Sequence, residues 1–274
     1  MSLNSLGIIG CGSMGEEIST FINSGKIQNA ELACVFDQDE TRLQEFSKKI
    51  SKKILLTSSI EKFLSIEKIN LVVECASPAA VTKYGELILK SNKNFLAMSS
   101  GAFNDPKLLK FLEKIAKQKS LKILIPSGAI GGIDAIKSIQ NQIEKVSITT
   151  TKHPLSLAGA PGFQSFENTV FDKAKVIFNG TAQDAIEMFP ANVNVSTTLS
   201  LAAIGTKKTQ VKIICDPKSK ENKHEICIIG PFGKLNFSMN LKPNKRNPKT
   251  SSLAIYSVIQ TIQQFCNPNI SLGT

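Results

Sequence analysis

The sequence is poor in the side chains that stack on nucleic-acid bases. It contains no tryptophan and only two tyrosines, although its net charge is +11. Single-stranded nucleic acids are bound by aromatic residues interleaved with basic ones, and here the lysines are spread over several segments without such a stripe. The positive charge therefore indicates a solvated basic surface that can attract an anionic ligand, and we expect no nucleic-acid partner.

Metal-binding and membrane-spanning patterns are also missing. There are two histidines, and none of the six cysteines forms a C-x-x-C pair. Most cysteines lie in apolar runs that resemble buried strands, so we expect reduced thiols and no metal. No apolar run approaches the roughly 20 residues of a membrane span, and no basic segment precedes an apolar one at the start. These absences predict a cytoplasmic protein that does not associate with a membrane.

A glycine-rich turn near the N-terminus is the most informative motif that is present. Residues 7–15 read Gly-Ile-Ile-Gly-Cys-Gly-Ser-Met-Gly, an apolar strand followed by G-x-G-x-x-G and a helix. In such a motif the first glycine permits a tight turn, the second lets a pyrophosphate approach, and the third lets the helix pack on the strand. Helix N–H groups then face the phosphates. The predicted cofactor contacts here are Gly10, Gly12, Ser13, Met14 and Gly15.

An acidic residue follows the next strand at the expected spacing. The strand over 31–36 ends in Asp37, close to the separation of about 20 residues at which an acid binds the adenosine ribose. A carboxylate at this position favours NAD, because its charge repels the 2′-phosphate of NADP. Arg42 is near enough in sequence to weaken that preference. The predicted cofactor is therefore NAD, with NADP as the alternative, and a ligand-free turn is the structural alternative.

Apolar strands alternate with amphipathic segments through the first half of the chain. This order is typical of a parallel sheet flanked by helices, so residues 1–132 are expected to form a Rossmann-type dinucleotide-binding domain. Ligands of such sheets bind at the carboxyl ends of the strands. Residues that follow two predicted strands are therefore candidate contacts: Ala76 and Ser77 for the cofactor, Ser99 and Ser100 for the substrate.

The second half of the chain follows a different pattern. A smaller α+β domain with a mostly antiparallel sheet is predicted over 133–246, for substrate binding, catalysis and dimerisation. It is expected to begin with a helix over 133–144 and to contain a loop over 153–168. The sequence Gly-Pro-Phe-Gly at 230–233 predicts a hairpin. A long helix over 247–266 has one apolar face and is expected to pack back on the first domain.

Four further motifs follow one another in the second half. They are Ser-Gly-Ala-Ile-Gly-Gly-Ile-Asp-Ala at 127–135, Phe-Pro-Ala-Asn-Val-Asn-Val at 189–195, Glu-Asn-Lys-His-Glu-Ile at 221–226 and Asn-Pro-Lys-Thr-Ser at 247–251. With the glycine turn, this order resembles the L-aspartate dehydrogenase family over nearly the whole chain. The resemblance implies a homodimer that uses NAD(P) to deaminate L-aspartate oxidatively. The product iminoaspartate hydrolyses to oxaloacetate and ammonia, and in some organisms it is thought to feed NAD biosynthesis.

The resemblance also assigns individual residues. It places the catalytic histidine at His224 and further cofactor contacts at Ala129 and Asn194. An imidazole, with a reference pKa near 6.5, can accept a proton from the amine and later activate water. On the residues alone, His224 could be structural and Asn194 could be an ordinary helix N-cap. His153, next to a proline in the predicted loop, is interpreted as structural.

Lys249 and Thr250 are candidates for binding the substrate carboxylates. They lie in the first turn of the last predicted helix, where backbone N–H groups favour anions. A solvated lysine is an equally good interpretation of Lys249. Two other functions stay open, because fold does not determine function. One is a reductase or dehydrogenase of another imino or keto acid, and the other is a dinucleotide-binding regulator without turnover.

Overall fold

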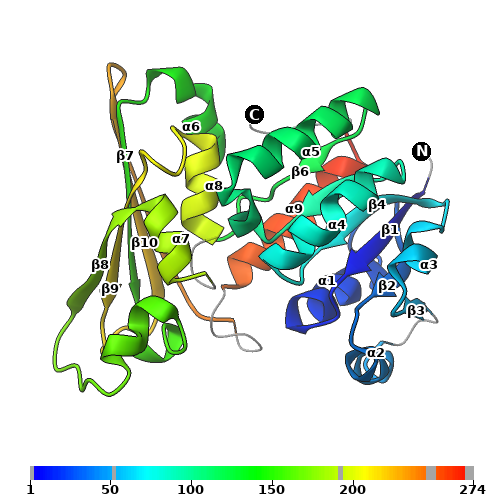
Figure 1. Cartoon of the computed structure of the whole chain (residues 1–274), viewed down its shortest axis with the longest axis horizontal. Coiled ribbons are helices and arrows are strands. Elements are labelled where there is room, and N and C mark those ends of the chain that lie inside the picture. The colour runs from blue at the N-terminus through cyan, green and yellow to red at the C-terminus, as the bar shows by residue number, and fades with distance from the viewer. Residues whose placement is uncertain (1–2, 51–53, 191–193, 245–250, 269–274) are drawn as a thin grey trace. The chain divides into compact units, whose positions relative to one another are not determined.

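The structure is a computed structural model that describes residues 3–50, 54–190, 194–244 and 251–268 (Figure 1). Its contacts divide the chain into two compact units. The first comprises Met1–Pro126 and Ile255–Ser271, and the second comprises Ser127–Ala254 and Leu272–Thr274.

The first unit contains a six-stranded sheet with the order β3-β2-β1-β4-β5-β6, in which every neighbouring pair is parallel. The strands are β1 (Asn4–Ile9), β2 (Ala30–Phe36), β3 (Leu55–Thr57), β4 (Ile69–Glu74), β5 (Asn94–Ala97) and β6 (Ile123–Leu124). This arrangement confirms the predicted Rossmann-type sheet. The direction of strand order reverses between β1 and β4, which is the point where such sheets bind ligands.

Helices connect these strands, and local sequence explains where they begin. They are α1 (Ser13–Asn23), α2 (Glu40–Ser47), α3 (Ile60–Leu64), α4 (Pro78–Lys90) and α5 (Pro106–Gln118), with a 3₁₀ helix η1 (Ser100–Asn104). Side chains of Asp39, Ser59, Ser77 and Asp105 accept hydrogen bonds from N–H groups in the first turns of α2, α3, α4 and α5. Proline at the start of α4 and α5 suits a position whose N–H needs no partner.

The last helix, α9 (Ser252–Cys266), contributes to the core of the first unit. Ile255, Val258 and Ile262 are at most 1% exposed and belong to the same apolar cluster as Leu6 and Ile8 of β1. Their spacing of three and four residues places them on one helix face. The chain therefore completes its first core with residues from its C-terminal end.

The second unit contains a five-stranded sheet with the order β11-β10-β7-β9-β8. The strands are β7 (Lys145–Lys152), β8 (Lys175–Thr181), β9 (Gln210–Cys215), β10 (Asn222–Gly230) and β11 (Gly233–Leu241). The pairing is antiparallel except between β7 and β9, which run parallel. The predicted mostly antiparallel sheet is confirmed, and so is the hairpin, in which Gly230 pairs with Gly233.

Helices of the second unit are α6 (Ile133–Ser138), α7 (Ala182–Met188) and α8 (Asn194–Ala202), and in Figure 1 they lie together on one side of the sheet. The helix predicted over 133–144 was wrong in length. After Ser138 the chain forms a 3₁₀ turn, η2 (Gln140–Gln142), and the N–H of Glu144 donates to Ile229 O at 2.9 Å. The N–H of Glu144 is therefore bonded to β10 and is not available for a helical hydrogen bond.

The loop predicted over 153–168 is more ordered than expected. It contains two 3₁₀ helices, η3 (Pro154–Ser156) and η4 (Pro161–Phe166), each of which begins at a proline. The pyrrolidine ring fixes φ near the helical value and lacks the N–H that would be unpaired at this position. Phe163 of η4 is buried in the core of this unit, which anchors the segment.

Candidate functional site

The glycine turn of the first unit meets three different steric requirements. Gly10 has a φ of +100°, which favours glycine. A Cβ on Gly15 would lie 2.0 Å from the carbonyl oxygen of Gly10, so a side chain there would collide with backbone. A Cβ on Gly12 would meet no atom within 4 Å. The turn is thus closed where α1 packs on β1 and open at Gly12, which fits the approach of a pyrophosphate.

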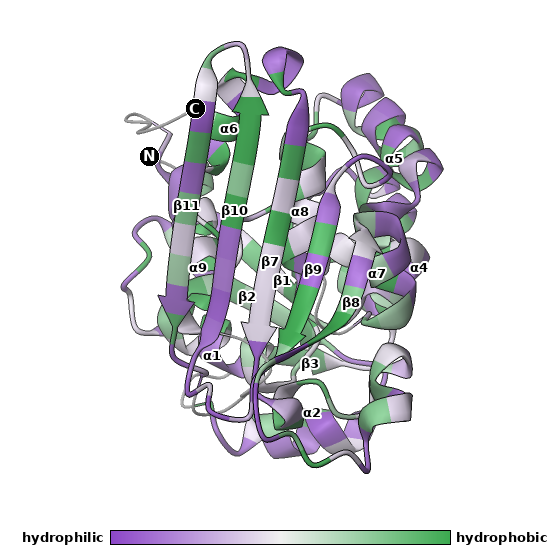
Figure 2. Ribbon diagram, turned by 90° about the vertical axis from the view of Figure 1, so that its left-hand side faces the viewer, coloured by the Kyte–Doolittle hydropathy of each residue, from purple (hydrophilic) through white to green (hydrophobic). Residues whose placement is uncertain are grey.

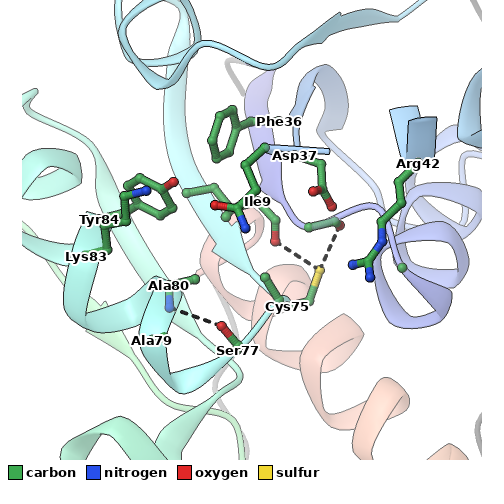
Figure 3. A pocket seen from close by; sticks show the side chains of 14 residues that line it. Ile9, Phe36, Asp37, Arg42, Cys75, Ser77, Ala79, Ala80, Lys83 and Tyr84 are labelled. Carbon is green, nitrogen blue, oxygen red and sulfur yellow. Dashed lines mark hydrogen bonds between the residues drawn. The ribbon is translucent and has the colours of Figure 1, made fainter. Parts of the chain in front are cut away.

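A pocket of about 260 Å³ lies beside this turn, at the carboxyl ends of β1, β2 and β4 (Figure 3). Five of the predicted cofactor residues line it: Gly10, Gly12, Asp37, Ala76 and Ser77. The lining does not include Ser13, Met14 or Gly15, which belong to the first turn of α1. In Figure 3, Lys83 and Tyr84 lie on the side of the pocket opposite Asp37 and Arg42. The pocket therefore combines one carboxylate with two cationic side chains.

Hydrogen bonds hold the Asp37 carboxylate beside the turn. Its Oδ2 accepts the N–H of Cys11 at 3.0 Å, and its Oδ1 accepts the N–H of Asp39 at 3.0 Å. The Cys11 thiol also donates to Oδ2 at 3.3 Å. Burial, together with the hydrogen bond to Asp37 and its charge, raises the pKa of Cys11 to about 12, so the thiol stays protonated and keeps donating. The carboxylate is thus oriented before any ligand arrives.

Glu74, at the end of β4, is a site residue that the sequence interpretation missed. Its Oε1 accepts hydrogen bonds from the N–H groups of Ala76 and Ser77 and from the hydroxyl of Ser99, and its Oε2 accepts the N–H of Ser99. Burial raises the pKa of this carboxyl, and the donated hydrogen bonds oppose that shift. The sequence did contain a signal for this residue, because Glu74 is an acid at the end of a nearly all-apolar strand.

This carboxylate connects residues from two predicted contact groups. Ala76 and Ser77 are predicted cofactor contacts after β4, and Ser99 is a predicted substrate contact after β5. Ser100 follows it as the first residue of η1 and is 2% exposed. Three of the four predicted residues at these strand ends, Ala76, Ser77 and Ser99, therefore form one hydrogen-bonded group around Glu74, and what they bind stays a prediction.

His224 lies in the second unit, in a group of four buried polar side chains that we name the polar quartet: Thr150, Lys152, Asn222 and His224. His224 pairs with Thr150 across β10 and β7. Lys152 and Asn222 lie two residues further along these strands, so the alternation of side chains puts all four on one face of the sheet. Each is at most 5% exposed.

The imidazole of His224 is neutral in this environment. Its Nδ1 lies 3.0 Å from Thr150 Oγ1. Burial, followed by the positive charge of Lys152, lowers the pKa of His224 to about 3. This is well below the reference value on which the interpretation of the sequence relied. The histidine can thus act as a hydrogen-bonding group or proton acceptor, but it holds a proton weakly unless its surroundings change.

The other candidate residues lie elsewhere. Ala129 and Asn194 belong to the second unit, where Ala129 is 9% exposed and Asn194 is the first residue of α8. Lys249 and Thr250 lie outside the described residues. His153 is the N-cap of η3, where its Nδ1 accepts the N–H of Leu155 at 3.2 Å.

The described part of the chain contains neither a metal-binding cluster nor a membrane-spanning helix. No three His, Cys, Asp or Glu side chains among those residues are grouped so that they could hold a metal ion. None of the helices within the described ranges is both long and apolar enough to cross a membrane.

Comparisons with known proteins place both units in one family of enzymes. A family model described as homoserine dehydrogenase, NAD binding domain, matches residues 10–126, and one described as aspartate dehydrogenase, C-terminal, matches residues 134–265. An L-aspartate dehydrogenase of Nitrosopumilus maritimus is 37% identical over 271 residues, which covers 98% of this chain and 99% of that protein. One from Methanococcoides burtonii is 40% identical over 276 residues, with the same coverage. The crystal structure of aspartate dehydrogenase from Thermotoga maritima matches with a TM-score of 0.75 and 28% identity over 100% of both chains.

The contrast between Gly12 and Gly15 can be tested by giving each a methyl group. We expect Gly15→Ala to lower the free energy of unfolding by about 2–3 kcal/mol, because its Cβ would overlap backbone. Gly12→Ala should change stability by less than about 1 kcal/mol, yet weaken NADH binding at least about tenfold by obstructing the pyrophosphate. Urea unfolding and NADH fluorescence titration measure the two effects. Wild-type NADH affinity in Gly12→Ala would contradict the predicted cofactor position.

Glu74→Gln tests the group at the ends of β4 and β5. An amide NH₂ would replace one of two oxygens that both face donors, so a buried N–H would lose its acceptor in either amide orientation. We expect the free energy of unfolding to fall by about 2 kcal/mol and the NADH affinity to fall with it. The control is Glu86→Gln, whose exposed carboxylate pairs with Lys90. Equal stability of the two variants would show that the four bonds are energetically unimportant.

Proposed function

The chain belongs to the L-aspartate dehydrogenase family, and we propose that it catalyses the NAD-dependent oxidative deamination of L-aspartate. The reaction takes a hydride from Cα and a proton from the amine, and it gives iminoaspartate, NADH and a proton. Water then hydrolyses the imine to oxaloacetate and ammonia. The reverse reductive amination uses the same groups, and the balance of metabolites determines which direction prevails. In the forward direction the imine is available as a precursor for NAD biosynthesis.

His224 is the proposed proton acceptor. The observation that carries this role is that the family's histidine falls on a buried, neutral imidazole in the polar quartet. The Thr150 hydroxyl at Nδ1 restricts rotation of the ring, which leaves Nε2 as the nitrogen that can face a substrate. A bound nicotinamide supplies the hydride acceptor. The imidazole accepts the proton that leaves the amine, and on imine hydrolysis it activates the attacking water.

The pocket of the first unit supports NAD as the preferred cofactor. The fixed Asp37 carboxylate accepts hydrogen bonds, as the two ribose hydroxyls of NAD require, and it repels a 2′-phosphate. The guanidinium of Arg42 lies on the same pocket and its Nε is 3.4 Å from Asp39 Oδ2. Its charge can compensate part of that repulsion. We therefore propose a preference for NAD, with NADP as a poorer cofactor.

A homodimer is proposed as the active assembly. In the second unit the described helices lie on one side of the sheet, and Figure 2 looks onto the other side. That side carries apolar residues among polar ones, including Ile214 of β9, and Val176 and Ile229, which are 49% and 37% exposed. A second copy of the same sheet can cover these residues symmetrically.

Substrate and base can be identified in one assay. The purified protein should reduce NAD with L-aspartate and with no other amino acid in a panel, and NADP more slowly. Loss of the imidazole in His224→Ala should lower kcat by about 10²–10⁴-fold, while NADH affinity stays unchanged. His153→Ala is the matched control, since it removes the other histidine. Turnover of a different amino or keto acid would favour the alternative enzyme, and tight NADH binding without turnover would favour a regulator.

The oligomeric state is measured by light scattering. The proposal predicts twice the 29.7 kDa of one chain. Ile214→Asp places a charge on the uncovered side of the sheet and should yield a folded monomer, because a buried unpaired carboxylate is costly. A monomeric wild type, or a dimer that Ile214→Asp leaves intact, would reject this interface.

A further inference from the structure

Lys152 is a buried lysine next to the proposed base. It is 4% exposed and is the last residue of β7. Lysine is rarely buried to this extent, because removing its ammonium group from water is costly. Lys93, in the first unit, is also buried, and there the ammonium donates to the carbonyl oxygens of Ile66 and Ile69 at 2.7 and 3.1 Å, which is a structural role. Lys152 shares its sheet face with Thr150 and His224, so it lies in the region of the proposed base.

The backbone holds Lys152 in a defined place. It pairs with Cys215 of β9, and its carbonyl oxygen accepts the N–H of Asp216 at 2.9 Å. Strand β10 begins beside the end of β7, and the sheet register sets His224 opposite Thr150, two residues before Lys152. A side chain that starts from such a paired strand position is well suited to orient a ligand.

The charge of Lys152 already acts on His224. It is the second cause, after burial, of the lowered pKa of the imidazole. Two cationic groups in one buried region disfavour each other, so the ammonium keeps the imidazole neutral. An anion bound at the ammonium would offset that effect and make the imidazole a stronger base.

We propose that Lys152 binds the side-chain carboxylate of the dicarboxylate substrate and thereby sets the substrate's amine against His224. The assignment rests on the proposed function and adds a specificity residue to it. An ammonium and a carboxylate form a charge-assisted hydrogen bond, which is strong when water is excluded. Because a carboxylate at this ammonium offsets its effect on the imidazole, substrate binding and base activation are coupled. An amino acid whose side chain is neutral or cationic has no side-chain carboxylate to pair with Lys152, so it would not strengthen His224 in this way.

The first experiment separates charge from shape. Lys152→Met keeps the length of the side chain and removes the charge, whereas Lys152→Arg keeps the charge. We expect Lys152→Met to raise the KM for L-aspartate about 10- to 100-fold, as loss of a charged hydrogen bond does, with NADH affinity unchanged. Lys152→Arg should recover part of this loss. The control, Lys114→Met, removes an exposed lysine of α5 in the first unit, which belongs to neither proposed site, and should behave as wild type.

The second experiment does not depend on turnover. With two histidines in the chain, the imidazole resonances can be assigned by comparison with His153→Ala. Succinate, a dicarboxylate that lacks the amine, is titrated into the NADH complex. We expect it to raise the pKa of His224, read from a pH titration of the ring resonances, in the wild type and to have no such effect in Lys152→Met.

These two readouts distinguish the possible failures. In one outcome, L-aspartate is not turned over, while succinate still changes the titration of His224 in the wild type and not in Lys152→Met. In that case the proposed substrate is wrong and the carboxylate site at Lys152 is retained. An unchanged KM in Lys152→Met overturns the proposal, as does a wild-type His224 that ignores succinate. Parallel losses of stability and NADH affinity in both Lys152 variants, without rescue by arginine, would assign Lys152 a structural role and overturn it as well.

Discussion

The carboxylate of Glu74 accepts four hydrogen bonds from residues that follow two neighbouring strands, and the arrangement of the first site depends on it. The carboxyl ends of β4 and β5 carry polar loops whose N–H groups have no strand partner. Burying them without acceptors would be costly, and the carboxyl group of Glu74 satisfies three of them. The same bonds bring Ala76, Ser77 and Ser99 to one place. The four donated hydrogen bonds offset part of the cost of burying this polar group.

The second unit also buries polar groups, but it surrounds them in a different way. Its sheet buries apolar residues along most of its helix-facing side, but one end carries the polar quartet. Here a cation and an imidazole share a buried region, and burial together with the charge of the cation keeps the imidazole neutral. A bound carboxylate would offset the effect of this cation on the imidazole. This is a property expected of a site for anionic substrates rather than of a structural core.

The two units also differ in what they say about function. The first has the glycine turn and acidic residue of many dinucleotide-binding proteins, so it identifies a cofactor and not a reaction. The second carries the histidine, and its match to the C-terminal aspartate dehydrogenase model makes the assignment specific. The function therefore follows from the combination, with the chemistry decided by residues that a common fold does not require.

Local sequence was sufficient for several features. Interactions between residues close in the chain, or a repeated pattern, determine these features. They are the glycine turn, Asp37, the alternation of strands and helices, the hairpin at Gly230 and the choice of cofactor. Strand β3 and the end of α6 escaped prediction, because pairing with distant strands decided them. The roles of Glu74 and Lys152 were equally hidden. An acid and a lysine at strand ends look like solvated residues in sequence, and only the register of the folded sheets surrounds one with donors and places the other beside His224, since burial and neighbouring charge are properties of the tertiary structure.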